Sequence, residues 1–136
     1  MQTETSHGPP AGPDAGGPFP AGKLQWRALL ETRWRARLQE VTELALAYHE
    51  AAAAAGQGTG GGEGGLQVQP LLRLQRLLRR TVTSRRALAD TEEALARLSA
   101  GRYGWCESCA GAIPAQRLAA TPETRYCARC ARGWGR

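Results

Sequence analysis

Four cysteines near the C-terminal end of the sequence have the spacing of a metal site. They form two Cys-x2-Cys pairs with seventeen residues between the pairs, and they are Cys106, Cys109, Cys127 and Cys130. Pairs separated by about 15 to 20 residues are typical of zinc sites, because each two-residue spacer lets a tight turn present both thiolates to one ion. The pattern therefore predicts one Zn²⁺ held tetrahedrally by these four thiolates.

The ligand set indicates a structural zinc rather than a catalytic one. Four protein thiolates close the coordination sphere, whereas a catalytic zinc keeps one position open for water. The two histidines, His7 and His49, lie far from the cysteines in the sequence, and we interpret both as surface residues. An iron–sulfur cluster or a redox switch is the minority alternative, because zinc would occupy the thiolates that such chemistry needs.

Disulfides are a less favoured use of the cysteines. The sequence shows neither a secretory signal nor an apolar run of membrane-spanning length, so we expect a cytoplasmic protein that does not enter a membrane. Cysteines stay reduced in that compartment. Four of them in a stretch of 25 residues then favour a metal ion.

A first helix is predicted over residues 23–55, which contain neither proline nor glycine. Apolar residues recur there at the three- and four-residue spacing of one helix face. The stripe consists of Leu30, Trp34, Leu38, Val41, Leu44, Ala45 and Tyr48, with Arg37 interrupting it. The alanines at 51–55 favour helix, and Gly56 is expected to end it.

A second helix is predicted over residues 70–100. Pro70 suits a first helical turn, because its missing amide proton needs no partner there, and Gly101 suits the left-handed residue that follows a helix. The apolar positions are Leu71, Leu74, Leu77, Leu78, Val82, Leu88, Leu95 and Leu98.

Three polar residues, Thr81, Arg85 and Glu92, fall at the spacing of those leucines. We expect the second helix to rotate slightly and to use Val82 and Leu88 at this stretch of its apolar face. The Arg85 side chain would then reach solvent along its aliphatic stem.

These elements predict a mostly α-helical fold. Neither helix can bury its stripe alone, and the glycine-rich segment 56–65 is a flexible linker by composition. The simplest arrangement is an antiparallel coiled-coil hairpin over residues 23–100, with pairing between two chains as the alternative. Residues 1–22, which hold five of the eight prolines, are predicted to be a disordered tail, and residues 101–136 a small four-cysteine zinc-finger module.

The zinc module is predicted to have an aromatic core. Ile113-Pro114 and Arg117-Leu118 lie between the cysteine pairs and are expected to pack against Tyr103, Trp105 and Tyr126. These aromatic residues alternate with arginines and could instead stack on nucleic-acid bases. A core role is favoured, because so small a module has few other large side chains to bury.

Positive charge is concentrated in the second half of the chain. Residues 66–136 contain thirteen arginines and five acidic residues, a net charge of +8, while the whole chain carries +6. Such a field favours an acidic partner, either nucleic acid or the negative surface of another protein. Seventeen of the eighteen basic residues are arginine, which coding bias alone would also produce, so nucleic-acid binding is the secondary prediction.

A longer set of motifs surrounds the cysteines between residues 88 and 130. It comprises Leu95-Ala96-Arg97-Leu98, Gly101-Arg102-Tyr103-Gly104-Trp105-Cys106-Glu107-Ser108-Cys109, Ile113-Pro114, Arg117-Leu118-Ala119-Ala120-Thr121-Pro122 and the second cysteine pair. This combination resembles the DksA/TraR family. The resemblance implies a helical hairpin with a C4 zinc finger, which binds bacterial RNA polymerase, inserts the hairpin into the secondary channel and needs no contact with DNA.

The sequence departs from the family pattern at several positions. The best-known members carry two aspartates at the hairpin tip, where this chain has glycines and Glu63, so the tip chemistry is not expected here. Thr121 and Asp90 stand where members that respond to the alarmone ppGpp tend to be basic, so no such response is expected. Ala110 replaces the usual glycine after the second cysteine, and Gly111 is expected to relieve the turn.

The predicted function is therefore that of a zinc-binding transcription regulator of the DksA/TraR type. A nucleic-acid-binding zinc ribbon and a structural coiled-coil adaptor are the alternatives. An enzyme is not expected and no catalytic residue is assigned, because the sequence has no nucleophile–base pair and no phosphate-binding glycine motif. Whether the chain acts as a monomer or a dimer is left open.

Overall fold

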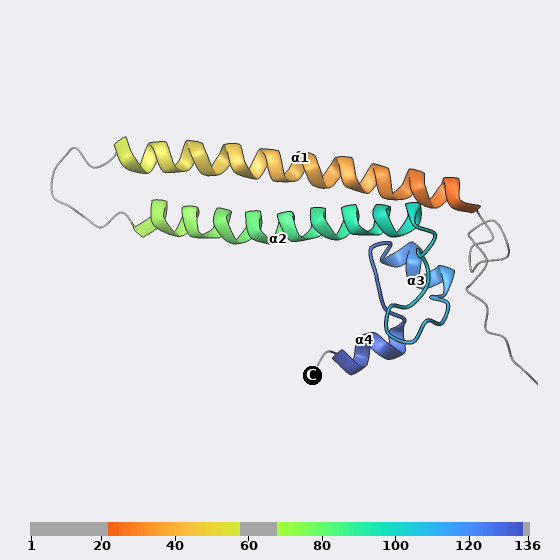
Figure 1. Ribbon diagram of the computed structural model, residues 1–136. Helices are drawn as coiled ribbons and strands as arrows, with labels where there is room; N and C mark the ends of the chain where they lie inside the picture. The colour runs from red at the N-terminus through yellow and green to blue at the C-terminus, as the bar shows by residue number, and fades with distance from the viewer. Residues whose placement is uncertain (1–21, 58–67, 135–136) are drawn as a thin grey trace, which may run out of the picture. The chain divides into compact units, whose positions relative to one another are not determined.

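The computed structural model describes residues 22–57 and 68–134. Within these ranges the chain forms four helices, α1 (Gly22–Gln57), α2 (Val68–Ser99), α3 (Ala115–Ala120) and α4 (Ala128–Trp134) (Figure 1). No strand occurs in the described ranges, where a single antiparallel bridge joins Trp105 to Ala112. The predicted mostly α-helical fold with a C-terminal cysteine cluster is confirmed. The predicted tail and linker lie outside the described residues, except for Gly22, Gly56 and Gln57.

The ends of the two long helices follow the local chemistry of the sequence. Helix α1 continues through Gly56 to Gln57, so this glycine does not end it. Helix α2 begins at Val68, which places Pro70 in the first turn. At the other end of α2, Gly101 has a φ of 74°. The N–H of Arg102 donates to the Arg97 carbonyl at 2.8 Å and that of Gly101 to the Leu98 carbonyl at 3.2 Å, the two bonds of a Schellman cap.

The described residues group into two compact units. Residues 33–90 form one unit, and residues 22–32 together with 91–134 form the other. Each long helix therefore contributes to both units. Among the described helices, none combines the length and the apolar character needed to cross a bilayer.

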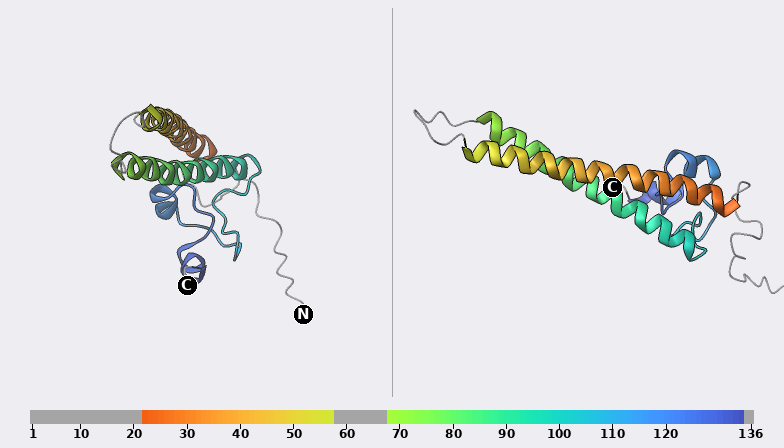
Figure 2. Two further views of the ribbon diagram at one scale, coloured as in Figure 1. Left: turned by 90° about the vertical axis from the view of Figure 1, so that its left-hand side faces the viewer. Right: turned by 90° about the horizontal axis from the view of Figure 1, so that it is seen from above.

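In the unit of residues 33–90, α1 and α2 run antiparallel and side by side (Figure 2). Leu44 and Ala51 of α1 and Ser84 of α2 are buried there. The half-buried residues include Trp34, Arg37, Val41, Ala45 and Tyr48 of α1 and Leu74, Leu77, Thr81 and Leu88 of α2. The predicted stripe of α1 is thus the packed face, but Leu38 is 41% exposed and does not widen it.

The packed face of α2 includes Leu88 as predicted but differs from the prediction at Val82. Val82 is 54% exposed, so the helix does not use it at the polar stretch. The packed positions are Leu74, Thr81 and Leu88 at seven-residue spacing, with Leu77 and Ser84 between them. Thr81 fits this face because its hydroxyl donates to the Leu77 carbonyl at 2.7 Å within the helix.

The second unit has one buried cluster shared by the helix ends and the zinc module. Its members are Trp26, Leu30, Ala94, Leu98, Tyr103, Cys106, Ile113 and Leu118. The rings of Trp26 and Tyr103 are 5.9 Å apart, in the range of favourable aromatic pairs. The expected core residues Tyr103, Ile113 and Leu118 are buried, Trp105 and Tyr126 are half-buried, and Pro114 is exposed. Trp26 was not among the predicted core residues.

Candidate metal centre

The first cysteine pair lies on a short hairpin-like turn after α2. Gly104, with a φ of 87°, starts the turn, and its carbonyl accepts the Ile113 N–H at 2.8 Å. Inside this frame the Cys106 N–H donates to the Gly111 carbonyl at 2.8 Å, and the Ala110 N–H donates to the Cys106 carbonyl at 2.9 Å. These bonds close the turn that presents both sulfurs to the same side.

The left-handed residue of this turn is Ala110, with a φ of 60°. The expectation that Gly111 would relieve the turn is therefore wrong. A left-handed conformation brings Cβ close to the following carbonyl and costs a residue other than glycine about 1 to 2 kcal/mol. A Cβ at Gly111 would lie 3.4 Å from the sulfur of Cys109, an ordinary van der Waals contact.

The second cysteine pair lies at the start of α4. Cys127 precedes the helix, and its carbonyl accepts the Ala131 N–H at 2.9 Å. Cys130 lies in the first turn of α4. The helical turn therefore places the two sulfurs three residues apart on one side of the helix, as a Cys-x2-Cys pair requires.

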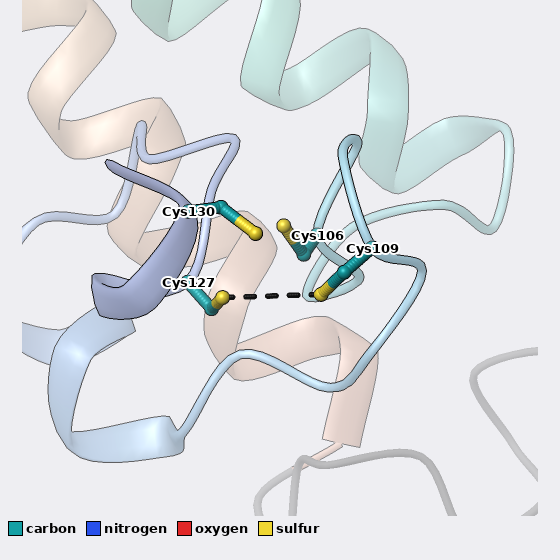
Figure 3. Close-up of side chains that lie close together, drawn as sticks. All are labelled: Cys106, Cys109, Cys127 and Cys130. Carbon is teal, nitrogen blue, oxygen red and sulfur yellow. Dashed lines mark hydrogen bonds between the residues drawn. The ribbon is translucent and has the colours of Figure 1, made fainter. Parts of the chain in front are cut away.

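The structure brings all four predicted ligands together. Their sulfur atoms all lie within 4.8 Å of one another, and those of Cys109 and Cys127 are 3.9 Å apart (Figure 3). A tetrahedral zinc with Zn–S bonds of about 2.3 Å places its sulfurs about 3.8 Å apart, whereas a disulfide needs about 2.05 Å. All four cysteines are free thiols, and Cys106 is buried. The cluster has the size of a zinc site.

The ionisation of the four thiols is unequal. Burial raises the pKa of Cys106, but backbone N–H groups of Cys109, Cys127 and Ser108 lower it more, to about 6 from the ordinary value of 9.0. Hydrogen bonds from the backbone and side chain of Cys130 lower the pKa of Cys127. The same bond to Cys127 raises the pKa of Cys130 to about 12. Without a metal, the four neighbouring thiols do not all ionise at the same pH. A bound divalent cation stabilises the negative charge of the sulfurs, so that all four can be thiolates.

A segment ahead of the second cysteine pair is tied to α2 by hydrogen bonds. The buried Arg97 donates to the Glu123 carbonyl at 3.2 Å, and the buried Thr91 donates to the Glu123 carboxylate at 3.2 Å. The Tyr103 hydroxyl donates to the Pro122 carbonyl at 2.9 Å. These contacts hold the chain that leads to Cys127 against the helix that leads to Cys106.

Arg117 lies inside this support. Its Nε donates to the Tyr126 carbonyl at 3.0 Å, next to Cys127, and its Nη2 donates to the Thr124 hydroxyl at 3.4 Å. Nearby, Arg125 forms an ion pair with Glu93 of α2. Arg117 therefore braces the zinc module.

Sequence reasoning did not assign roles to Thr91 or Glu123. Thr91 lies seven residues after Ser84, on the packed face of α2. The apolar pattern did not include it, because threonine is polar. The contacts of Glu123 with Thr91 and Arg97 join residues 32 and 26 positions apart, and no local sequence pattern predicts them.

The four clustered cysteines after the two long helices have the arrangement of a C4-type zinc finger. Residues 101–133 match the family model of the prokaryotic dksA/traR C4-type zinc finger. This segment is thus a zinc finger of the DksA/TraR type, which confirms the resemblance, and it carries one structural Zn²⁺.

Two further proteins are similar to this chain. The structure resembles that of the transcription factor DksA2 from Pseudomonas aeruginosa, with a TM-score of 0.69 and 20% identity over 82% of this chain and 81% of that one. At this identity the likeness establishes a DksA-like fold. An uncharacterized protein from Aquifex aeolicus (strain VF5) is 50% identical over 44 residues, which are 32% of this chain and 30% of that relative. The match thus spans less than a third of that protein.

Proposed function

We propose that this protein is a zinc-binding transcription regulator of the DksA/TraR type that binds bacterial RNA polymerase at its secondary channel. The observation that carries the proposal is the shared buried cluster, in which Trp26 and Leu98 of the long helices pack with Tyr103 and Ile113 of the zinc finger. A zinc finger in the same core as the helix ends supports a single binding element made of both. In this proposal the protein acts in the cytoplasm by binding, not by catalysis.

We propose that Cys106, Cys109, Cys127 and Cys130 are the zinc ligands. The support is the close approach of their four sulfurs and the absence of histidine and other metal-binding side chains from the cluster among the described residues. The zinc would hold the two turns together, so that metal binding and folding of residues 101–136 are one event.

The proposed mode of action does not use acidic tip chemistry. Glu63, the single acidic residue of the linker, lies outside the described residues and is flanked by glycines. Positioning one carboxylate on such a chain requires ordering many free dihedral angles, which opposes binding. The proposal is therefore that the hairpin occludes the channel or shifts the conformation of the polymerase, without a response to ppGpp.

The test is a binding experiment with core RNA polymerase. Zinc-loaded protein should bind the polymerase at low salt, and removal of the zinc with a strong chelator should abolish binding, because the base of the hairpin loses its core. Absence of binding by the zinc-loaded protein would refute the proposal. Binding to DNA without polymerase, with a steep loss of affinity as salt rises, would instead support the nucleic-acid-binding zinc ribbon.

A further inference from the structure

Helix α2 exposes a second apolar surface in the unit of residues 33–90. Its members, here called the leucine face, are Val68, Leu71, Leu72, Leu78 and Val82, which are 42% to 58% exposed. Most of them line a hollow of about 450 Å³, together with Leu74, Gln75 and Tyr48, the last from α1. Contiguous exposed apolar surface is unusual on a protein that works alone and marks an interaction site.

The leucine face adjoins the side of α2 that is packed on α1, and α1 leaves it uncovered. Positions 71, 75, 78 and 82 follow one another at four-, three- and four-residue steps, which keeps them on one side of a helix. The side packed on α1 uses positions 74, 77, 81, 84 and 88 instead. Helix α2 therefore has one wide apolar surface, of which α1 covers one part and leaves the leucine face exposed.

Arginines border the leucine face along its length. Arg79 follows Leu72 at seven-residue spacing, and Arg85 and Arg86 lie just beyond Val82, so one long edge and the C-terminal end of the stripe are basic. All six arginines of α2 between Val68 and Asp90 are exposed, and they are Arg73, Arg76, Arg79, Arg80, Arg85 and Arg86. Asp90 is the one acidic residue in that stretch.

The positive charge around the leucine face favours an acidic partner. A second copy of α2 on the leucine face would bring arginines against arginines, which opposes association in either direction of the helices. A surface with an apolar ridge between carboxylates complements both the leucines and the arginines. We propose that the leucine face docks such an acidic, amphipathic protein surface on RNA polymerase, an inference that rests on the function proposed above.

Substitution of two central leucines tests the inference. Full-length, zinc-loaded protein carrying Leu71→Gln and Leu78→Gln should bind core polymerase at least about 10-fold more weakly, because apolar anchors at the centre of an interface dominate its affinity. Leu46→Gln is the matched control. Leu46 lies on α1, outside the leucine face, and is 58% exposed, the same as Leu71. The control should bind as the wild type does.

A charge reversal separates the two parts of the proposed surface. Arg79→Glu with Arg86→Glu should lower the association rate and flatten its dependence on salt, while circular dichroism shows unchanged helix content. Since all these side chains are exposed, none of the substitutions removes core packing.

Each outcome supports or overturns a stated step. If the wild type binds polymerase and the double leucine variant binds equally well, the leucine face is not the docking surface, although the proposed function stands. If the wild type does not bind at all, the proposed function fails and this inference fails with it. If the wild type sediments as a dimer and the double leucine variant as a monomer, with equal polymerase binding, the occupant is a second copy and the proposed partner is wrong.

Discussion

Replacement of Ala110 by glycine should strengthen zinc binding. Ala110 is left-handed, with a φ of 60°, and its side chain is exposed, so the Cβ is strained and packs against little. Removal of the Cβ relieves about 1 to 2 kcal/mol. Glycine also gains freedom in the unfolded chain, which offsets about 0.4 to 1 kcal/mol. The net gain is about 0.5 to 1 kcal/mol in the folded zinc module.

Zinc affinity reports this gain directly, because the metal site and the fold of the module form together. At about 1.4 kcal/mol per tenfold change, the Ala110→Gly variant should bind zinc about 2- to 5-fold more tightly than the wild type. The assay is competition with a chromophoric chelator of known affinity at fixed pH. Total zinc per chain should stay at one.

Ala112→Gly is the control, because it replaces alanine by glycine at a position where the backbone is not left-handed. Ala112 also lies between the cysteine pairs and is exposed, but it forms the bridge to Trp105 and does not have a positive φ. Glycine there should weaken zinc binding, because it adds only unfolded-state freedom, about 0.5 to 1 kcal/mol. If both variants weaken zinc binding to the same extent, Ala110 is not strained and the reasoning is refuted.

Four further predictions concern the ligands, the helix pair, the brace and the linker. Cys109→Ser or Cys127→Ser should release the zinc and unfold residues 101–133, because zinc binding and folding of the module are coupled. Metal analysis and limited proteolysis measure the two effects. A variant that keeps one zinc per chain would exclude the substituted cysteine as a ligand. Ser84→Ala should raise the free energy of unfolding by about 0.5 to 1 kcal/mol in a denaturant titration, because the buried Ser84 hydroxyl has no hydrogen-bond partner among the described residues; a loss of stability would reveal one. Arg117→Ala should destabilise the zinc module by about 1 to 3 kcal/mol in a denaturant titration, because it removes a charged donor from the Tyr126 carbonyl, which also accepts from the Thr124 hydroxyl; an unchanged stability would show that Arg117 is not a brace. Glu63→Ala should change transcription in vitro little, and a large effect would show that the linker carboxylate takes part.

The features that the sequence determined by itself are those governed by near neighbours in the chain. Two residues between cysteines suffice to set a turn or a helical step that aims both sulfurs at one ion, so the spacing of Cys106 and Cys109 could be interpreted without a structure. The left-handed cap at Gly101 is local in the same sense, because its two hydrogen bonds reach back no further than Arg97. The two long helices follow from periodicity and from the lack of helix-breaking residues in their interiors.

The tertiary structure decided which face of α2 meets α1. Periodicity reveals an apolar stripe but does not rank two stripes on one helix, and here the leucines at 71 and 78 competed with a packed face that includes Thr81 and Ser84. The apolar pattern predicted Leu74, Leu77 and Leu88 correctly, but it also included Leu71, Leu78 and Val82, which are exposed, and it missed Thr81 and Ser84. A small polar side chain can lie in a helix pair when its hydroxyl bonds to the preceding turn, as that of Thr81 does.

The core of the zinc module also depended on contacts between distant residues. Trp26 packs on Tyr103, and Thr91 bonds to Glu123, across separations in sequence for which no local rule exists. The strain at Ala110 belongs to the same class, since the closing bonds of the turn, and not the preference of the residue, impose its positive φ. Local chemistry decides which elements form and where they end, while the burial of distant side chains against one another decides which faces meet.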